Sequence, residues 1–175
     1  MSWRVCIALV IVSLAVFPLF AVSWQSHEHK FSFAAPHAGW RDMGAVRQGI
    51  LQEGVVEFVS TNGFVFTVSR FPYRVDEGWE LSRVKKTADM TLSMINARVG
   101  PIMQIGRSGE CRVNGAPGWH YQISYLYAGR VYFAHIVVLV KNDVHYRLLY
   151  TWPGDLYRDG HLEYQQIMTS FRISD

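Results

Sequence analysis

Alternating apolar residues predict most of the strands in this chain, and the clearest pair lies in EGVVEFVSTNGFVFTVSRF, residues 53–71. Two runs rich in β-branched and aromatic residues flank Asn62-Gly63. This pair favours a two-residue type I′ hairpin turn, because both turn positions require φ > 0. The turn predicts a hairpin in which Val59 lies opposite Phe66.

Three further strands follow one another at 119–127, 131–141 and 144–151. The turn Asn142-Asp143 between the last two places His135 opposite Tyr150. Between the first two strands, a three-residue loop at 128–130 is preferred to a two-residue loop, because it places a set of apolar residues on one face of the sheet. A register shift of one residue would move that set to the other face. The set is Trp119, Tyr121, Ile123, Tyr125, Phe133, Val137, Leu139, Tyr146 and Leu148. The opposite face, with an apolar central strand, is expected to be partly covered by a helix.

Apolar residues three and four apart predict two helices. The first spans about 76–98, with Asp76 as N-cap and Gly100-Pro101 ending it. Its stripe consists of Leu81, Val84, Ala88, Leu92, Ile95 and Val99. The second spans 155–172, with a stripe of Tyr157, His161, Tyr164, Met168 and Phe171.

The remaining segments complete one domain. Residues 24–30 are a polar lead-in, a short strand begins at Phe31 and stops at Pro36, and residues 101–118 indicate short strands and turns. Repeats and linkers are lacking in the sequence. We therefore expect a single α+β domain at 31–173.

The N-terminal segment predicts export. Arg4 precedes an uncharged apolar run, and Ala21-Val22-Ser23 offers the small residues of a signal-peptidase site. Cleavage after Ser23 is preferred, which gives a periplasmic protein. The alternative is an inner-membrane anchor, because residues 5–24 have about the length that crosses a bilayer. Both alternatives place the domain outside the cytoplasm.

The charge of the chain argues against a nucleic-acid-binding protein, and its cysteine content argues against a disulfide-stabilised one. Loss of residues 1–23 removes one of the 17 basic residues. The remaining 16 basic and 14 acidic residues give a net charge of +2. Without a basic cluster, nucleic acid is not an expected partner. Cys111 is the single cysteine after the targeting segment. An internal disulfide is thus impossible, and the hydrophobic core must stabilise the domain.

Two groups of residues are candidates for binding. A candidate surface combines one polar sheet face with two arginines of a loop at 107–116, and consists of His120, Gln122, His145, Arg147, Arg107 and Arg112. A candidate pocket between sheet and helices is formed by Tyr125, Tyr127, Tyr132, His135 and Tyr150.

Catalytic chemistry is not expected. Carboxylates that could orient a catalytic histidine are absent from the three strands at 119–151, apart from the turn residue Asp143. His27 and His29 are metal-ligand types, yet two ligands do not close a site. Cys111 beside Arg112 is weak evidence for a nucleophile. We therefore predict no catalytic residue, no metal and no cofactor.

Four segments make the chain resemble the PsbP-like family in the broad sense, including exported bacterial domains of the DcrB and LpqN type. They are the motif from Phe31 to Trp40, Gly115 to Tyr121, His145 to Pro153, and Ser170-Phe171-Arg172. The resemblance implies an antiparallel sheet with helices packed on its faces, an α-β-α sandwich. It also implies a non-catalytic role in assembly or protein binding, and no catalytic residues to transfer.

Three functions remain open in order of preference. The first is an accessory domain of the cell envelope that binds a protein partner, with a possible membrane tether through residues 5–24. The second is a small-molecule carrier with a cavity between sheet and helices. The third is a hydrolase that uses His120 or Cys111.

Overall fold

The computed structural model describes residues 22–45, 55–72 and 80–175, which form ten strands and two α-helices. In chain order they are β1 (Val22–Ser26), β2 (Phe31–Ala35), β3 (Trp40–Ala45), β4 (Val55–Ser60), β5 (Val65–Pro72), α1 (Glu80–Arg98), β6 (Ile102–Val113), β7 (Ala116–Tyr127), β8 (Arg130–Lys141), β9 (Val144–Pro153), the 3₁₀ turn η1 (Gly154–Leu156), α2 (Tyr157–Ser170) and β10 (Arg172–Ile173).

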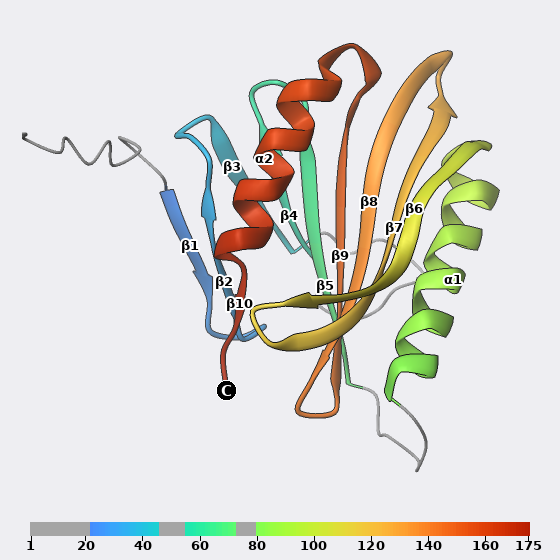
Figure 1. Cartoon of the computed structure of the whole chain (residues 1–175). Helices are drawn as coiled ribbons and strands as arrows, with labels where there is room; N and C mark the ends of the chain where they lie inside the picture. The colour runs from blue at the N-terminus through green and yellow to red at the C-terminus, as the bar shows by residue number, and fades with distance from the viewer. Residues whose placement is uncertain (1–21, 46–54, 73–79) are drawn as a thin grey trace, which may run out of the picture.

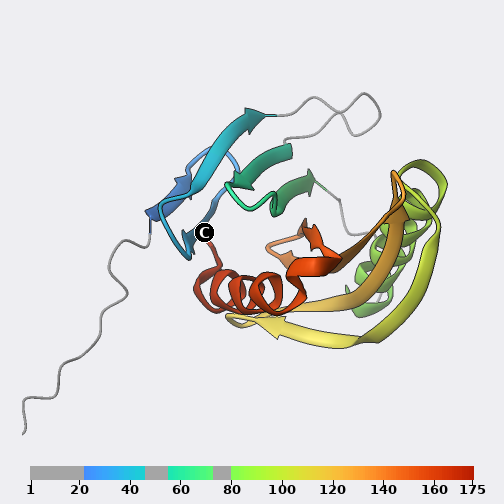
Figure 2. The ribbon, with the colours of Figure 1, turned by 90° about the horizontal axis from the view of Figure 1, so that it is seen from above.

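The strands form two antiparallel sheets. The large sheet has the order β3-β4-β5-β9-β8-β7-β6, and the small sheet has the order β1-β2-β10. Helix α1 lies at the β6 end of the large sheet, and α2 lies near β2 (Figure 1). Viewed from above, α2 lies between β2 and the hairpin of β6 and β7 (Figure 2). The protein is therefore α+β with helices packed against antiparallel sheet, as predicted.

The first core lies between the large sheet, α2 and the small sheet. Strands β4, β5, β8 and β9 contribute alternate residues to it, and aromatic rings dominate its centre. Its largest fully buried members include Phe31, Phe33, Phe64, Phe66, Tyr146, Tyr150, Trp152 and Phe171. Gly160 brings α2 close to this core, because a Cβ there would lie 2.3 Å from the Trp152 ring.

The second core lies under α1 on the other face. Alternate residues of β7 and β8 meet the stripe of α1 that the sequence predicts, of which Val84, Ala88 and Ile95 are buried. Val99, the expected end of the stripe, is instead 41% exposed just beyond the helix. Strand β8 is buried on both faces from Ala134 to Val140, and apart from His135 this run is apolar, as expected for a strand covered on two sides.

Two predicted hairpin registers are wrong, and one is confirmed. Phe58 pairs with Phe66 and Val59 with Val65, and the Ser60 amide donates to the Phe64 carbonyl at 2.9 Å, so the turn has the three residues 61–63. Between β8 and β9, the turn at 142–143 places His135 opposite Tyr150, as predicted.

The register between β7 and β8 carries the larger correction. Ala128 and Gly129 both have positive φ, 47° and 77°, and form a two-residue turn. Tyr125 therefore lies opposite Tyr132, not Phe133. As a result the odd-numbered residues of β7 face α1 instead of joining the face that carries Phe133.

Several elements differ from the expected boundaries. Residues 22–26 form β1 and pair with β2, where a polar lead-in was expected. Strand β3 was not predicted, and β6 is one long strand where short strands and turns were expected. The expected N-cap Asp76 and most of the segment 5–24 lie outside the described residues. Within the described part of the chain, no helix is long and apolar enough to cross a membrane.

Candidate functional site

The predicted binding surface is divided between the two faces of the sheet. His145 and Arg147 are buried on the face of the large sheet that α1 covers, where His145 Nδ1 lies 3.4 Å from Thr87 Oγ1 and Arg147 donates to Ser69 Oγ at 3.1 Å. Burial lowers the pKa of Arg147 to about 10. These two residues therefore stabilise the packing of the α1 face and are not available to a partner.

His120 and Gln122 lie on the opposite face of the sheet, the α2 face, because the two-residue loop before β8 sets the register of β7 with β8. His120 Nδ1 donates to the Gly109 carbonyl at 3.1 Å, which ties β7 to β6. Arg107 and Arg112 are exposed residues of β6, not of a loop. The six predicted residues thus do not form one surface, but Gln122 and Arg107 come together, as described below.

The predicted pocket is also divided. Tyr125 stacks on Tyr132 with ring centroids 5.7 Å apart on the α1 face, and Tyr127, 52% exposed, contacts the same ring edge to face. Burial raises the pKa of Tyr125 to about 12. His135 and Tyr150 belong to the α2 face. None of these five residues lines the grooves described below, so the expected pocket is replaced by aromatic packing.

His135 lies in an aromatic cluster under α2. Its ring stacks on Tyr164 at 3.7 Å and on Trp152 at 5.5 Å, and neither ring nitrogen has a hydrogen-bond partner in the described part of the chain. Burial lowers its pKa to about 3, helped by the nearby His161 and His120. The imidazole is therefore neutral at physiological pH.

The candidate nucleophile and metal ligands have unsuitable surroundings. Cys111 packs against the first core, and burial raises its pKa to about 11, so the reactive thiolate is scarce at neutral pH. Among the described residues no three side chains of histidine, cysteine or acidic type are grouped to hold a metal ion. His29 lies 4.0 Å from Glu28, and the sequence neighbour His27 is exposed.

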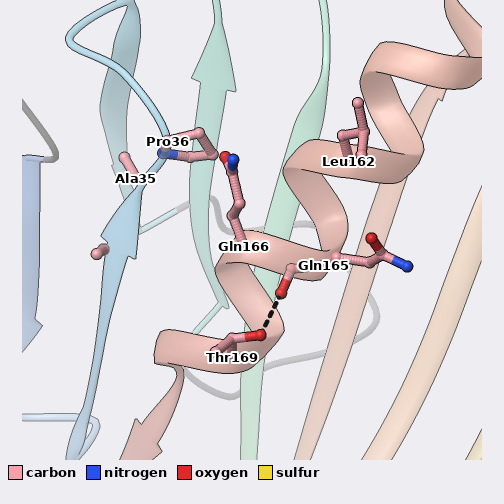
Figure 3. A pocket seen from close by; sticks show the side chains of 7 residues that line it. Ala35, Pro36, Leu162, Gln165, Gln166 and Thr169 are labelled. Carbon is pink, nitrogen blue, oxygen red and sulfur yellow. Dashed lines mark hydrogen bonds between the residues drawn. The ribbon is translucent and has the colours of Figure 1, made fainter. Parts of the chain in front are cut away.

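A first groove, the α2–β2 groove, runs between the end of β2 and the outer side of α2 (Figure 3). It has a volume of about 450 Å³. Its lining has no charged side chain and consists of Ala34, Ala35, Pro36, Leu162, Gln165, Gln166 and Thr169. Leu162 is 48% exposed and stands on the helical wall of the groove.

Hydrogen bonds hold the two walls of this groove together. Ser170 Oγ accepts from the Ala34 amide at 2.9 Å, which binds the end of α2 to β2. Half a helix away, Glu163 accepts from Trp40 Nε1 at 2.9 Å and from His37 Nε2 at 3.2 Å. His37 Nδ1 in turn accepts from the Gly39 amide at 3.0 Å, which leaves the ring hydrogen on Nε2. The groove is thus formed in the free protein.

A second groove, the β6–β7 groove, lies on the α2 face where the helix no longer covers the sheet. Its volume is about 390 Å³, and its lining is Gln104, Gly106, Arg107, Gln122, Ile123, Ser124, Phe133 and Tyr157. The strand register explains this grouping. Gln104 pairs with Ser124, and Ser124 pairs with Phe133, so the three form a row across the sheet.

A β-bulge brings Arg107 into the β6–β7 groove. Ile105 pairs with Ile123, whereas Ser108 pairs with Tyr121, so Gly106 and Arg107 both oppose Gln122. Two residues opposite one locally break the alternation of a strand and redirect a side chain. Arg107 and Gln122 were candidates from the sequence, whereas Gln104, Ser124 and Tyr157 were not. Only the register and the bulge reveal that these residues lie together.

Comparisons with known proteins concern the fold. No protein-family profile and no curated protein sequence matches the chain. Among solved structures, the cyanobacterial PsbP (CyanoP) of a Synechocystis species covers 91% of this chain and 95% of its own, with a TM-score of 0.64 and 11% identity. The chain has the PsbP-like fold.

A second similar structure is LpqN of Mycobacterium tuberculosis, described as involved in cell envelope biogenesis. It covers 89% of this chain and 86% of its own, with a TM-score of 0.57 and 11% identity. These comparisons confirm the architecture that the sequence motifs implied. At this identity they extend to the fold alone.

Proposed function

We propose that the protein is a non-catalytic binding domain of the cell envelope, and that a protein partner inserts an apolar side chain into the α2–β2 groove. The observation that carries this proposal is the groove itself, which is about 450 Å³ in volume and uncharged, and whose helix is fixed against the strands by internal hydrogen bonds. A preformed apolar recess is a typical anchor site for a buried side chain of a partner. The exposed Leu162 would become buried in such a complex.

The envelope location rests on the N-terminal sequence, with Arg4 before an uncharged apolar run. Whether the segment is cleaved or remains as a membrane anchor can be tested directly. The intact mass of the protein from host membrane and soluble envelope fractions distinguishes the two. Cleavage after Ser23 would remove Val22, which pairs with Ala35 and packs against the first core. We keep cleavage as the proposal, with a shortened β1 as its structural consequence.

Site-specific photo-crosslinking in the native host tests partner binding. A crosslinking amino acid at Gln166, inside the groove, should capture a protein, whereas the same group at Met90 of α1, which is 56% exposed and far from the groove, should not. Leu162→Glu should abolish the capture, because it places a charge in an apolar recess, and its exposed position keeps the fold intact. Equal capture from both positions, or capture unchanged by Leu162→Glu, would refute the proposal.

The same groove supports a second candidate function, the carriage of a small apolar molecule, because its volume lies within the range of roughly 300–1,000 Å³ usual for ligand sites. Native mass spectrometry separates the two functions. A small adduct that is lost in Leu162→Glu would favour the carrier, and a protein-sized adduct would favour the accessory domain.

A further inference from the structure

The β6–β7 groove contains two polar groups that have no partner within the described part of the chain. Arg107 makes no ion pair or hydrogen bond there, although the bulge directs it to the groove. The Ser124 hydroxyl also has no partner, and the residue is only 9% exposed. The Ser124 oxygen is not one of the enclosed polar atoms that lack a partner, so it is open to the groove, where a ligand can reach it.

A third polar group is positioned by its neighbours. Tyr157 packs edge to face on Phe133, with ring centroids 4.7 Å apart. Its hydroxyl oxygen accepts a hydrogen bond from Gln122 Nε2 at 3.4 Å, which leaves the hydroxyl hydrogen available for a ligand. Phe133 in turn stacks on the fully buried Trp152 at 5.8 Å, so this aromatic wall of the groove is fixed.

The lining therefore combines one cation, two hydroxyl groups, two amides and an aromatic wall, with no acidic side chain. An arginine fork matches a carboxylate in geometry, and a single cation balances a single negative charge. We propose that the β6–β7 groove binds a monocarboxylic acid with an apolar body. Arg107 and the hydroxyls of Ser124 and Tyr157 bind the carboxylate, and the apolar body lies against Phe133.

This site is independent of the α2–β2 groove, and two sources can supply its ligand. A free organic acid and the C-terminal carboxylate of a polypeptide present the same group. Phenylacetate represents the first source and N-acetyl-phenylalanine the second. Both fit the volume of about 390 Å³.

Ligand-detected saturation-transfer NMR on the full chain in a non-ionic detergent tests the proposal. We expect saturable binding of phenylacetate that Arg107→Gln weakens at least tenfold, because a hydrogen bond to a charged group is lost. Phenylacetamide, which has the same shape and no charge, should bind at least tenfold more weakly than phenylacetate. Ser124→Ala, a small change at a buried position, should weaken binding severalfold.

Two control variants make the outcome decisive. Arg112→Gln removes an exposed arginine of the same strand that does not line the groove, and it should leave binding unchanged. Leu162→Glu in the α2–β2 groove should also leave it unchanged. The absence of saturable binding, or equal effects of Arg107→Gln and Arg112→Gln, would overturn the proposal. Tighter binding of N-acetyl-phenylalanine would assign the carboxylate to a chain terminus, and tighter binding of phenylacetate to a free acid.

Discussion

Acidification should destabilise the protein through His135, which is 5% exposed and has no hydrogen-bond partner on either ring nitrogen among the described residues. Protonation would place a charge between the Tyr164 and Trp152 rings, in the first core. Burial therefore holds the pKa of His135 at about 3 in the folded state, with further repulsion from His161 and His120.

Proton linkage gives the direction and the size of this change in the free energy of unfolding. In the unfolded chain the pKa of His135 returns to about 6.5, so below that pH the unfolded state binds a proton that the folded state refuses until about pH 3. The stability from the neutral imidazole is complete above pH 6.5 and is lost as the pH falls. Between pH 7.5 and pH 5.0 the loss amounts to about 2 kcal/mol. This figure requires only that the folded pKa lies well below 5.

Urea unfolding of the wild type and of His135→Phe at the two pH values measures this loss. Phenylalanine retains a flat ring for the stack and does not titrate, so the variant should lose about 2 kcal/mol less than the wild type on acidification. Replacement of the exposed His27 by Asn is the matched control and should not change the difference. An equal loss in wild type and His135→Phe would refute the reasoning, because the imidazole would then be hydrated or charged in the fold.

Three further predictions concern packing and reactivity. Gly160→Ala should destabilise the protein by about 1–2 kcal/mol in urea unfolding, since overpacking against Trp152 exceeds the gain of about 1 kcal/mol in helix propensity; an increase in stability would contradict the close contact. Glu163→Gln leaves one acceptor oxygen for the two N–H donors of His37 and Trp40, so we expect the free energy of unfolding in urea to fall by about 1–3 kcal/mol. An unchanged stability would argue against both hydrogen bonds. Cys111 should react with iodoacetamide at pH 8 at least ten times more slowly than free cysteine, because burial raises its pKa to about 11 and the loss of thiolate exceeds the gain in thiolate nucleophilicity; a rate equal to that of free cysteine would show an open thiol.

The sequence predicts those parts of the fold where local signals agree. Helix α1 has a single apolar stripe, and Val84 and Ala88 are buried as its spacing requires. The turn Asn142-Asp143 adopts positive φ at both positions, so the register of β8 with β9 follows from turn chemistry alone.

The register of β7 could not be predicted in the same way. A buried face normally selects the register, because a slip of one residue exposes the apolar set. Here α1 covers one face of β8 and α2 covers the other, so Ala134 and Val137 are both buried although they point in opposite directions. Hydrophobicity therefore does not distinguish the two loops. The turn that forms also requires a positive φ at Ala128, which is uncommon for alanine, so turn chemistry does not predict it.

This one-residue difference decides the candidate site. It moves His120 and Gln122 to the α2 face, and so separates them from His145 and Arg147, which polarity alone had grouped and which stay on the α1 face. It also places Ser124 opposite Phe133 on the α2 face. The row that forms the β6–β7 groove exists only in this register. A bulge in β6, whose position no periodicity indicates, then adds Arg107. The polar residues that a partner or ligand can reach are therefore determined by the coverage of the two faces, since exposure depends on where the helices end and not on the polarity of a strand.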